Sequence, residues 1–373
     1  MKIALVHDQL QEFGGAERVF VALKEIFPQA DVFTSFYNPS QLGRHASKFK
    51  GWHIHTSWAQ KVPFFNKLYS PLRFMAPYIW ESFNFNDYDV VISSSGWYMS
   101  KGIITRPKTL HICYLHHQPR YLYYYETAVE WQKYLPVKIY AHLVNTTLRM
   151  WDFISSQRPN YFIANSEETK KRIAKFYRRD ATVIYPPVNI PHGIHEAVDI
   201  KNKGYYFTLS RLTKAKHIEV MIHAANKYKF KLKIGGVGRD EEYLKSIAGD
   251  TVEFLSSVKD EDFARLFTHA KAFLNAAIDE EFGISIVEAM GYSLPAIGFS
   301  SGGVTETIQD GKNGYLYNEL NADSLYEKIK ILESLSTEKY KEMCITARKS
   351  AEQYSFDNFK KNILDFIESK FKK

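Results

Sequence analysis

The chain has 373 residues and a formal net charge of +8, and hydrophobic residues make up 45% of it and charged residues 24%. These are globular proportions, which exclude long disorder, a collagenous repeat and a coiled coil, and the length predicts two domains. The only cysteines are Cys113 and Cys344, which excludes a disulfide framework and a structural zinc site of the cysteine type. Because the sequence contains neither the apolar run of a signal peptide nor the roughly 18 apolar residues of a membrane span, we expect a cytoplasmic protein, free or attached to a membrane surface.

Short apolar runs alternate with helical patterns through the first half of the chain. The run 3–6 is followed by the glycine pair Gly14-Gly15 and then by helical spacing over 16–23. Further strands are expected at 31–34, 89–95, 110–116 and 161–166. Strands separated by helices predict a parallel sheet with crossover connections.

Pro186-Pro187 interrupts this pattern, because two prolines continue neither a helix nor a central strand. The stretch from Pro191 to Gly204 predicts a linker, after which the pattern restarts. The second half has expected strands at 205–209, 230–234, 272–276 and 295–299, expected helices at 217–228 and 284–290, and a mostly helical end from Ala322. We therefore predict two α/β domains, at residues 1–190 and 200–355.

Glycine pairs follow several expected strands. They are Gly14-Gly15, Gly235-Gly236-Val237-Gly238 and Gly302-Gly303, which follows the last expected strand. Glycine lets the backbone approach a ligand closely, and the amides of a helix N-terminus attract phosphate. The alternative for each pair is a tight turn without a ligand. In open α/β sheets, however, ligands bind at the carboxyl edge of the strands, where all three pairs are expected.

Two cations, Arg211 and Lys216, lie just after the strand expected at 205–209. Such a pair suits a diphosphate, since arginine binds as a fork and lysine as a point charge. The alternative is a pair of exposed surface cations.

The stretch from Glu280 to Met290 is the most informative part of the chain. Gly283 predicts that a helix begins after it, so Glu280 lies in a loop and Glu288 lies one turn into the helix. Carboxylates accept hydrogen bonds from sugar hydroxyls, and the helix amides would face a phosphate. A helix dipole that favours acidic residues explains Glu280 and Glu281, but it explains Glu288 poorly because Glu288 stands among apolar residues.

On these residues the chain resembles the retaining glycosyltransferases of family 4, which have the GT-B fold. Glu280 and Glu288 match the family's E-x7-E motif in its E-x-F-G-x-x-x-x-E-A-M form, and Arg211 and Lys216 match its basic pair. The weaker matches are Gly14 to Val19 for G-G-A-E-R-V, Asn165, Ser166 and Thr169 for N-S-x-x-T, and Pro186 to Val188 for P-P-V. The resemblance implies two Rossmann-like domains that face each other across a donor cleft. It also implies that a last helix, within 356–373, packs back on the N-terminal domain.

The resemblance also implies roles for individual residues. Glu288 would bind the ribose of a nucleotide sugar and Glu280 the transferred sugar, while Arg211 and Lys216 would neutralise the departing diphosphate without a metal or another cofactor. The residues implied to bind the donor are Gly14, Gly15, Arg211, Lys216, Glu280, Phe282, Gly283, Ile284 and Glu288. No catalytic nucleophile is evident, and the family's retention would proceed by front-face attack.

The segment from Tyr114 to Tyr121 resembles a Y-x-H-T-P-x-R-Y segment of mannosyltransferases that act on bacterial surface polysaccharides. His116 falls on that family's histidine, near the donor sugar, and completes the implied catalytic set with Glu280, Arg211 and Lys216. His117 and Gln118 replace the usual Thr and Pro. The resemblance therefore implies mannose from GDP-mannose, with a glycan or polyprenyl-linked acceptor. A structural histidine at a strand end is the alternative reading of His116.

Two aromatic segments with scattered basic residues span Trp58–Trp80 and Tyr121–Trp151. They could lie in an anionic membrane interface and present the site to a lipid-linked acceptor, or they could form core and acceptor-cleft packing, which prolines 63, 71 and 77 favour slightly. The basic helix from Thr169 to Arg179 is expected to be a solvated face, and contact with an anionic lipid surface is the alternative.

Other functions remain open on the sequence alone. One alternative is a glycosyltransferase that uses a UDP-sugar as its donor. Another is a nucleotide-sugar epimerase with the same fold, which the E-x7-E context disfavours. A nucleic-acid binder would suit the charge and the aromatic residues, but the chain contains no recognisable nucleic-acid motif, so we expect no nucleic-acid partner.

Overall fold

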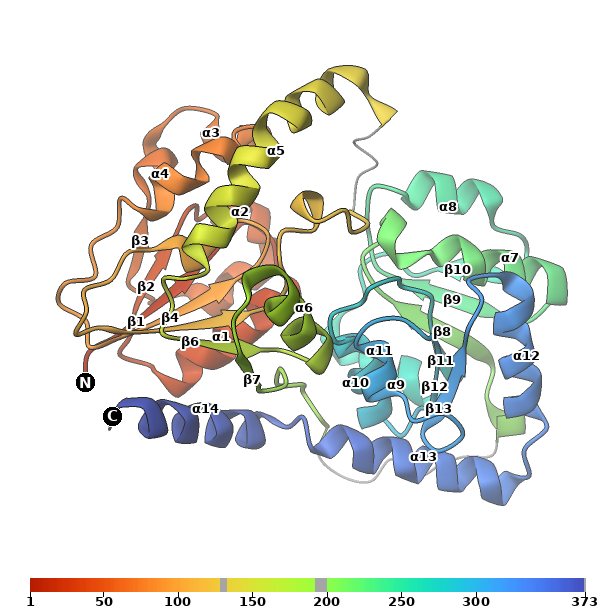
Figure 1. Ribbon diagram of the computed structural model, residues 1–373. Coiled ribbons are helices and arrows are strands. Elements are labelled where there is room, and N and C mark those ends of the chain that lie inside the picture. Colours follow the sequence, from red (N-terminus) through yellow and green to blue (C-terminus); the bar gives the residue numbers. More distant parts are fainter. Residues whose placement is uncertain (128–132, 192–199, 372–373) are drawn as a thin grey trace. The chain divides into compact units, whose positions relative to one another are not determined.

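The computed structural model describes residues 1–127, 133–191 and 200–371 (Figure 1). The chain forms two compact units, one of Met1–Tyr125, Trp131–Pro187 and Phe359–Lys373, the other of Glu126–Glu130 and Val188–Asn358. The central part of the expected linker, 192–199, lies outside the described residues.

A seven-stranded parallel sheet forms the centre of the first unit, in the order β3-β2-β1-β4-β5-β6-β7. Its strands are β1 (Ile3–His7), β2 (Asp31–Thr34), β3 (Ile54–Thr56), β4 (Val90–Ser95), β5 (Leu110–Leu115), β6 (Tyr161–Ala164) and β7 (Ala181–Val183). Five of these strands were expected. Strands β3 and β7 were not expected, because each is a three-residue edge strand that is only partly buried and so has no continuous apolar run.

The helices of the first unit that the structure describes are α1 (Gly15–Ile26), α2 (Pro39–Leu42), α3 (Phe65–Leu68), α4 (Ala76–Trp80), α5 (Leu135–Ser155), α6 (Glu167–Tyr177) and α14 (Phe356–Phe371). Helix α14 lies with this unit from Phe359 onward, where the Phe359 ring meets Tyr114 of β5 at 6.0 Å and Phe366 meets Tyr161 of β6 at 6.1 Å.

Helix α6 is not a solvated basic face throughout, which corrects that expectation. Arg172 is buried, and its Nε donates to Glu168 Oε1, one turn earlier, at 2.8 Å. A buried guanidinium needs such a partner, so the run of charges here includes a structural ion pair.

A six-stranded parallel sheet forms the second unit, in the order β10-β9-β8-β11-β12-β13. Its strands are β8 (Tyr205–Leu209), β9 (Leu232–Gly235), β10 (Val252–Phe254), β11 (Ala270–Asn275), β12 (Ala296–Phe299) and β13 (Gly314–Tyr317). Its described helices are α7 (Ile218–Tyr228), α8 (Glu241–Ile247), α9 (Phe263–Thr268), α10 (Ile284–Gly291), α11 (Val304–Thr307), α12 (Ala322–Glu333) and α13 (Thr337–Glu352). The expectation that Gly302-Gly303 follows the last strand is wrong, because β13 comes after it. The prediction of two Rossmann-like α/β domains is confirmed.

A buried ion pair fastens the turn after β4 to α5 in the first unit. Lys101 and Asp152 form it with no exposed side-chain surface, and the Tyr123 hydroxyl donates to the second carboxylate oxygen, Oδ2, at 2.7 Å. Because both carboxylate oxygens are engaged, the desolvation of the pair is compensated. Within the described residues, no helix combines the length and apolarity needed to cross a bilayer.

Candidate functional site

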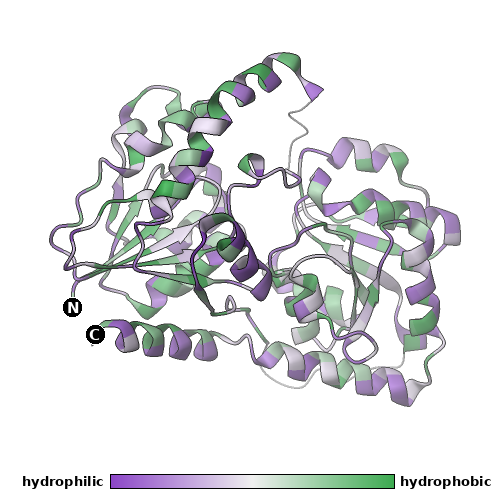
Figure 2. Ribbon diagram, in the orientation of Figure 1, coloured by the Kyte–Doolittle hydropathy of each residue, from purple (hydrophilic) through white to green (hydrophobic). Residues whose placement is uncertain are grey.

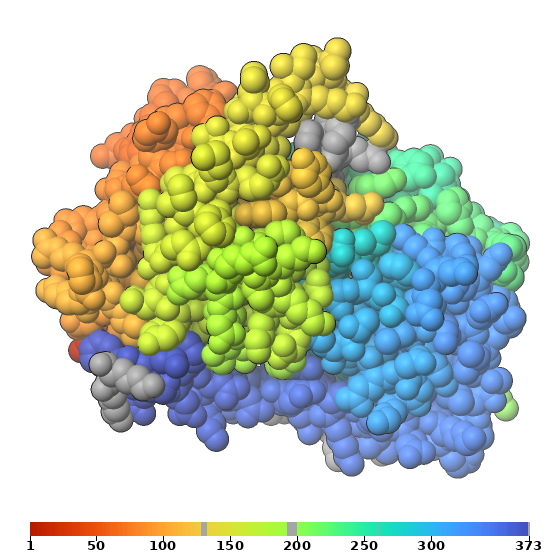
Figure 3. Space-filling model, in the orientation of Figure 1, coloured from red at the N-terminus to blue at the C-terminus, as the bar shows by residue number. Residues whose placement is uncertain are grey.

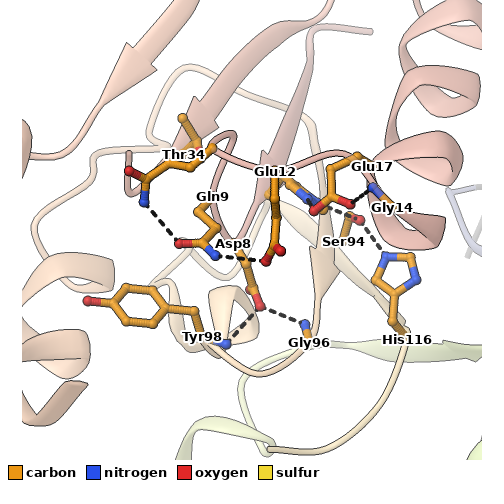
Figure 4. A network of polar contacts seen from close by, with 12 residues as sticks. Asp8, Gln9, Glu12, Gly14, Glu17, Thr34, Ser94, Gly96, Tyr98 and His116 are labelled. Atoms are coloured by element: carbon orange, nitrogen blue, oxygen red, sulfur yellow. Dashed lines mark hydrogen bonds and ion pairs between the residues drawn. The ribbon is translucent and has the colours of Figure 1, made fainter. Parts of the chain in front are cut away.

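A chain of polar side chains crosses the carboxyl ends of β1, β4 and β5 in the first unit (Figure 4). His7 Nε2 lies 3.3 Å from Glu17 Oε1, and His7 Nδ1 lies 3.0 Å from Ser94 Oγ. Ser94 Oγ in turn lies 2.7 Å from His116 Nε2. All four side chains are buried, so the predicted site residue His116 is tied through two further groups to a buried carboxylate.

The direction of the hydrogen bond between His7 and Glu17 follows from the charge on Glu17. Burial acts to raise the pKa of Glu17, but the hydrogen bond and charge of His7, with backbone amides, outweigh it and lower the pKa. The carboxylate is therefore ionised at neutral pH and only accepts, which places a proton on His7 Nε2. The Ser94 hydroxyl lies between the two rings, where it contacts His7 Nδ1 and His116 Nε2 and can donate to one ring while it accepts from the other. The chain thus orients the His116 ring.

The predicted phosphate-binding glycines lie at the start of α1. The Gly14 amide donates to Glu17 Oε2 at 2.7 Å, so Gly14 caps the helix together with Glu17. Gly15 is the first residue of α1, where amides have no partner within the helix. The amides of Gly14 and Gly15 were both predicted to contact phosphate. In the structure the Gly14 amide is already hydrogen-bonded to the Glu17 carboxylate.

Sequence reasoning missed Asp8, which orders the loop after β4. Its buried carboxylate accepts from the amides of Gly96 at 2.9 Å and Tyr98 at 2.8 Å (Figure 4). It also accepts from the amide of Ser100 at 2.8 Å. The available signal was a charged residue directly after an apolar strand. His7 and Ser94 carried a similar signal, since each is a polar residue near the carboxyl end of a buried strand.

In the second unit, the predicted residues Lys216 and Glu280 form an ion pair. Lys216 ends a short turn after β8, and Glu280 lies in the loop after β11, the neighbouring strand. Their side chains are 25% and 15% exposed, so solvent and a ligand can reach the pair. Arg211 lies exposed in the same loop as Lys216.

The third glycine pair holds the Glu280 loop in place. A Cβ on Gly302, whose φ is +59°, would lie 2.3 Å from the Glu280 carbonyl oxygen, and one on Gly303 would lie 2.2 Å from that of Glu281. The Gly303 amide donates to the Glu280 carbonyl at 2.7 Å. The loop after β12 therefore needs glycine in order to touch the loop after β11, and this contact alone accounts for the pair.

The same reason applies to Gly236, which follows β9. Its φ is +124°, and a Cβ there would lie 1.9 Å from the carbonyl oxygen of Ser210, beside Arg211. In two of the three glycine runs, glycine therefore allows two loops to pack closely against each other. This role resembles the tight-turn alternative more than a phosphate-binding site.

Helix α10 begins directly after Gly283, as the sequence predicted. Gly283, with φ +88°, is the N-cap, and Ile284 is the first helical residue. Phe282 is buried with its ring centre 5.0 Å from that of Tyr354, which anchors the loop. Glu288 lies inside the helix and is only 5% exposed. The first-turn amides of α10 and two carboxylates, one in the loop and one in the helix, are thus on the same short segment.

His217, directly after Lys216, was not predicted. Its ring bridges Glu219 Oε1 at 2.9 Å and Glu126 Oε2 at 2.8 Å. Burial acts to lower the pKa of His217, but the hydrogen bonds that its ring donates to Glu219 and Glu126, and the charges of these carboxylates, raise it overall. This ion-paired histidine fixes the turn that carries Lys216.

Within the described residues, three metal-ligating side chains come together neither in the hydrogen-bond chain from Glu17 to His116 nor around Lys216 and Glu280. The one such group found there, Asp31, His53 and His55, lies at the amino ends of β2 and β3. That donor binding needs no metal stays a prediction.

Comparisons with known families divide the chain in two. Residues 13–191 match the family Glycosyltransferase Family 4, and residues 194–350 match the family Glycosyl transferases group 1.

Among curated proteins, the chain is similar to the GtfA subunit of UDP-N-acetylglucosamine–peptide N-acetylglucosaminyltransferase from Streptococcus pneumoniae serotype 4. The two are 25% identical over 260 residues, which cover 67% of this chain and 50% of the relative. The α-1,3/1,6-mannosyltransferase ALG2 of Dictyostelium discoideum is 23% identical over 240 residues, covering 52% of this chain and 56% of ALG2. The chain spans about half the length of these curated relatives.

Two solved structures have the same fold. HepE from Anabaena, in complex with UDP and glucose, is 19% identical, with a TM-score of 0.72 and coverage of 99% of this chain and 100% of that one. Sucrose-phosphate synthase from Thermosynechococcus elongatus is 14% identical, with a TM-score of 0.75 and coverage of 100% and 99%. These likenesses identify the fold as GT-B.

The contact between the β11 and β12 loops predicts that Gly302→Ala destabilises the second unit more than Gly311→Ala does. Both glycines have positive φ, but only a Cβ at position 302 would overlap a neighbouring backbone. We expect a loss of about 1–2 kcal/mol from the backbone conformation in both variants, and a further loss of about 1–3 kcal/mol at position 302. Urea unfolding followed by circular dichroism measures both. Equal losses would show that the two loops do not constrain each other.

Proposed function

We propose that this protein transfers a sugar from a nucleotide-diphosphate donor to an acceptor hydroxyl. The proposal starts from the matches of residues 13–191 to glycosyltransferase family 4 and of residues 194–350 to the group 1 glycosyl transferases. The observation that carries the proposal is the arrangement around α10. Glu280 and Lys216 are paired at neighbouring strand ends, and Glu288 is buried in the helix that follows. A sugar with a diphosphate has hydroxyl groups for the carboxylates and negative charge for the cation.

In the proposed complex, the donor's phosphates take up the charge of Lys216 and Arg211 and face the first-turn amides of α10. Lys216 then shares its charge between phosphate and Glu280, so the Glu280 carboxylate gains freedom to accept from sugar hydroxyls. Glu288 accepts from the ribose hydroxyls. Fixed positive groups at the diphosphate stabilise the charge that develops there as the bond to the sugar breaks.

We propose a retaining reaction. The bond between the anomeric carbon and the phosphate oxygen breaks, and the acceptor oxygen forms its bond to the same face of that carbon. The proton of the acceptor hydroxyl passes to an oxygen of the departing diphosphate, so that no protein nucleophile is needed. The Arg211 and Lys216 side chains remain charged throughout and act only through electrostatics.

The proposed donor is GDP-mannose. The segment around His116 supports mannose, as does the similarity to a protein named as a mannosyltransferase. A UDP-sugar is the second candidate, because HepE was solved with UDP and glucose and GtfA is named for UDP-N-acetylglucosamine. Both domain families are glycosyltransferases, which favours transfer over epimerisation.

A thermal-shift panel without metal, in EDTA, tests the donor. A ligand at 100 times its dissociation constant stabilises the protein by about 2.7 kcal/mol, so we expect GDP and GDP-mannose to raise the melting temperature. Glu288→Gln should weaken the donor by about 1.5–3 kcal/mol through loss of a charge-assisted hydrogen bond. Glu327→Gln, on the exposed surface of α12, is the control and should bind as the wild type does. A shift with UDP-sugars alone would change the donor, and no shift with any nucleotide would refute the proposal.

The Glu17–His7–Ser94–His116 chain predicts a difference between two neighbouring serines. Ser94→Ala removes the hydrogen bond that orients His116, so we expect donor turnover to fall about tenfold, as for a hydrogen bond worth about 1.4 kcal/mol, with donor affinity retained. His116→Ala should lower turnover further. Ser93→Ala is the matched control, because Ser93 makes a 2.8 Å contact with His111, another buried histidine, which was not assigned to the site. Release of nucleoside diphosphate from the donor measures turnover, and equal losses in Ser93→Ala and Ser94→Ala would mean that the chain is structural only.

The proposed acceptor is a glycan or polyprenyl-linked sugar at an anionic membrane, and the exposed face of α5 supports it. Large apolar side chains recur along that face with helical spacing, with Leu143 69% exposed, and Figure 3 shows α5 in yellow at the surface of the first unit. The exposed apolar residues of α5 are Leu135, Ile139, Leu143, Met150, Phe153 and Ile154. Asp152, the one acidic residue of α5, is buried in an ion pair with Lys101. The other charged residues of α5 are Lys138 and Arg149, and both are basic.

Contacts within the first unit bring the two aromatic segments together. The Tyr140 hydroxyl of α5 donates to the Pro71 carbonyl, and Arg73 donates to Asn145 Oδ1 at 3.1 Å. The segment Trp58–Trp80 divides accordingly. Its buried core residues are Ala59, Phe65, Ala76, Ile79 and Trp80, and its exposed large hydrophobic residues are Trp58, Val62, Phe64, Leu68, Phe74 and Tyr78. Hydrophobic residues in both segments are coloured green in Figure 2.

We expect the protein to float with vesicles that contain anionic lipid and not with neutral vesicles, because apolar burial and basic charge act together at an interface. Leu143→Asp should abolish flotation and leave the donor-induced thermal shift unchanged. Ile345→Asp, at an exposed apolar residue of α13, is the control and should still float. Flotation that is unaffected by Leu143→Asp would exclude α5 as the membrane contact.

A further inference from the structure

Three side chains with metal-binding atoms meet at the edge of the first sheet that is opposite to the candidate site. Asp31 is the first residue of β2, and His53 and His55 flank Ile54, the first residue of β3. All strands of this sheet are parallel, so these residues lie at the amino edge. His7, Ser94 and His116 lie at the carboxyl edge.

The strand geometry places the three side chains on one face. Residues two apart on a strand point the same way, which puts His53 and His55 together. The register pairs Phe33 with His55, so Asp31, two residues before Phe33, is level with His53. The two imidazole rings are 4.4 Å apart between centres, and the His55 ring stacks on Phe33 at 4.6 Å.

The donor atoms are within reach of one ion. One ligand atom from each of Asp31, His53 and His55 lies within 4.8 Å of the others. Zinc binds nitrogen and oxygen at about 2.0–2.2 Å, so neighbouring ligand atoms on one ion lie a little over 3 Å apart. His53 is 74% exposed, and its side chain can therefore turn to close the remaining distance.

Surrounding groups prepare these atoms for a metal. The Tyr88 hydroxyl donates to Asp31 Oδ2 at 2.7 Å, which leaves Oδ1 to face His53 Nδ1, also at 2.7 Å. Such a hydrogen bond to a ligating carboxylate is the usual outer support of a metal site. Within the described residues, the buried Nε2 of His55 has no hydrogen-bond partner, an unfavourable state for a polar atom.

We infer that Asp31, His53 and His55 form a binding site for a divalent transition-metal ion of the zinc class. Two imidazoles and one carboxylate are the ligands that zinc accepts, whereas magnesium and calcium prefer oxygen ligands alone. Water completes the coordination on the exposed side. The ion ties edge strand β3 to β2 and plays no part in sugar transfer, and the inference does not depend on the proposed function.

Zinc titration of the full chain, without a polyhistidine tag and stripped with a chelator, tests the site. We expect one Zn²⁺ per chain by calorimetry, with a rise in melting temperature as zinc is added. Co²⁺ at the same site should give the visible absorption of a low-coordinate nitrogen and oxygen complex. No binding of either ion would overturn the inference.

Variants assign the bound ion to these residues. His53→Ala, His55→Ala and Asp31→Asn should each weaken zinc binding at least tenfold, and Tyr88→Phe should weaken it less. His223→Ala, at an exposed histidine of α7, is the control and should bind one ion as before. Asp31→Asn keeps the shape of the side chain, and His53 is exposed, so these two variants are expected to fold. Zinc binding that survives both of them would also overturn the inference.

Discussion

Parallel pairing of strands is the constraint on which the rest of this structure depends. A parallel strand can follow its neighbour only after a crossover, so every strand of a sheet ends at the same edge. His7, Ser94 and His116 meet at that edge in one unit, and Lys216 and Glu280 meet there in the other. The proposed zinc ligands lie at the opposite edge of the first sheet, which separates the proposed stabilising role from the proposed catalytic one.

Buried carboxylates organise the carboxyl-edge loops. Asp8 gathers three backbone amides after β4, and Glu17 both caps α1 and begins the hydrogen-bond chain to His116. Such groups are costly to bury, so they persist only with all partners in place. In the second unit the Lys216–Glu280 pair stays partly exposed, as the proposed binding of a charged donor at this pair requires.

Local sequence patterns predicted most central strands, and they predicted the start of α10, because long apolar runs and an N-cap glycine are local signals. The same patterns missed the short edge strands β3 and β7, neither of which is fully buried. They also placed Gly302-Gly303 after the last strand, which is wrong, and they placed Arg172 on a solvated face, although it is buried. Whether a glycine faces a phosphate or another loop, and whether an arginine faces water or a carboxylate, depends on residues distant in the sequence or on the packing of the helix.

The sequence by itself determined the class of fold and indicated the chemistry proposed here, since alternation of strands and helices and the spacing of Glu280 and Glu288 are properties of the chain order. The tertiary structure alone decided which side chains share a site. His7 and Ser94 are 87 residues apart and Lys216 and Glu280 are 64 apart, and only the hydrogen bonding of neighbouring strands brings them within contact distance. A hydrogen bond or an ion pair forms over about 3 Å, and no separation along the chain encodes that distance.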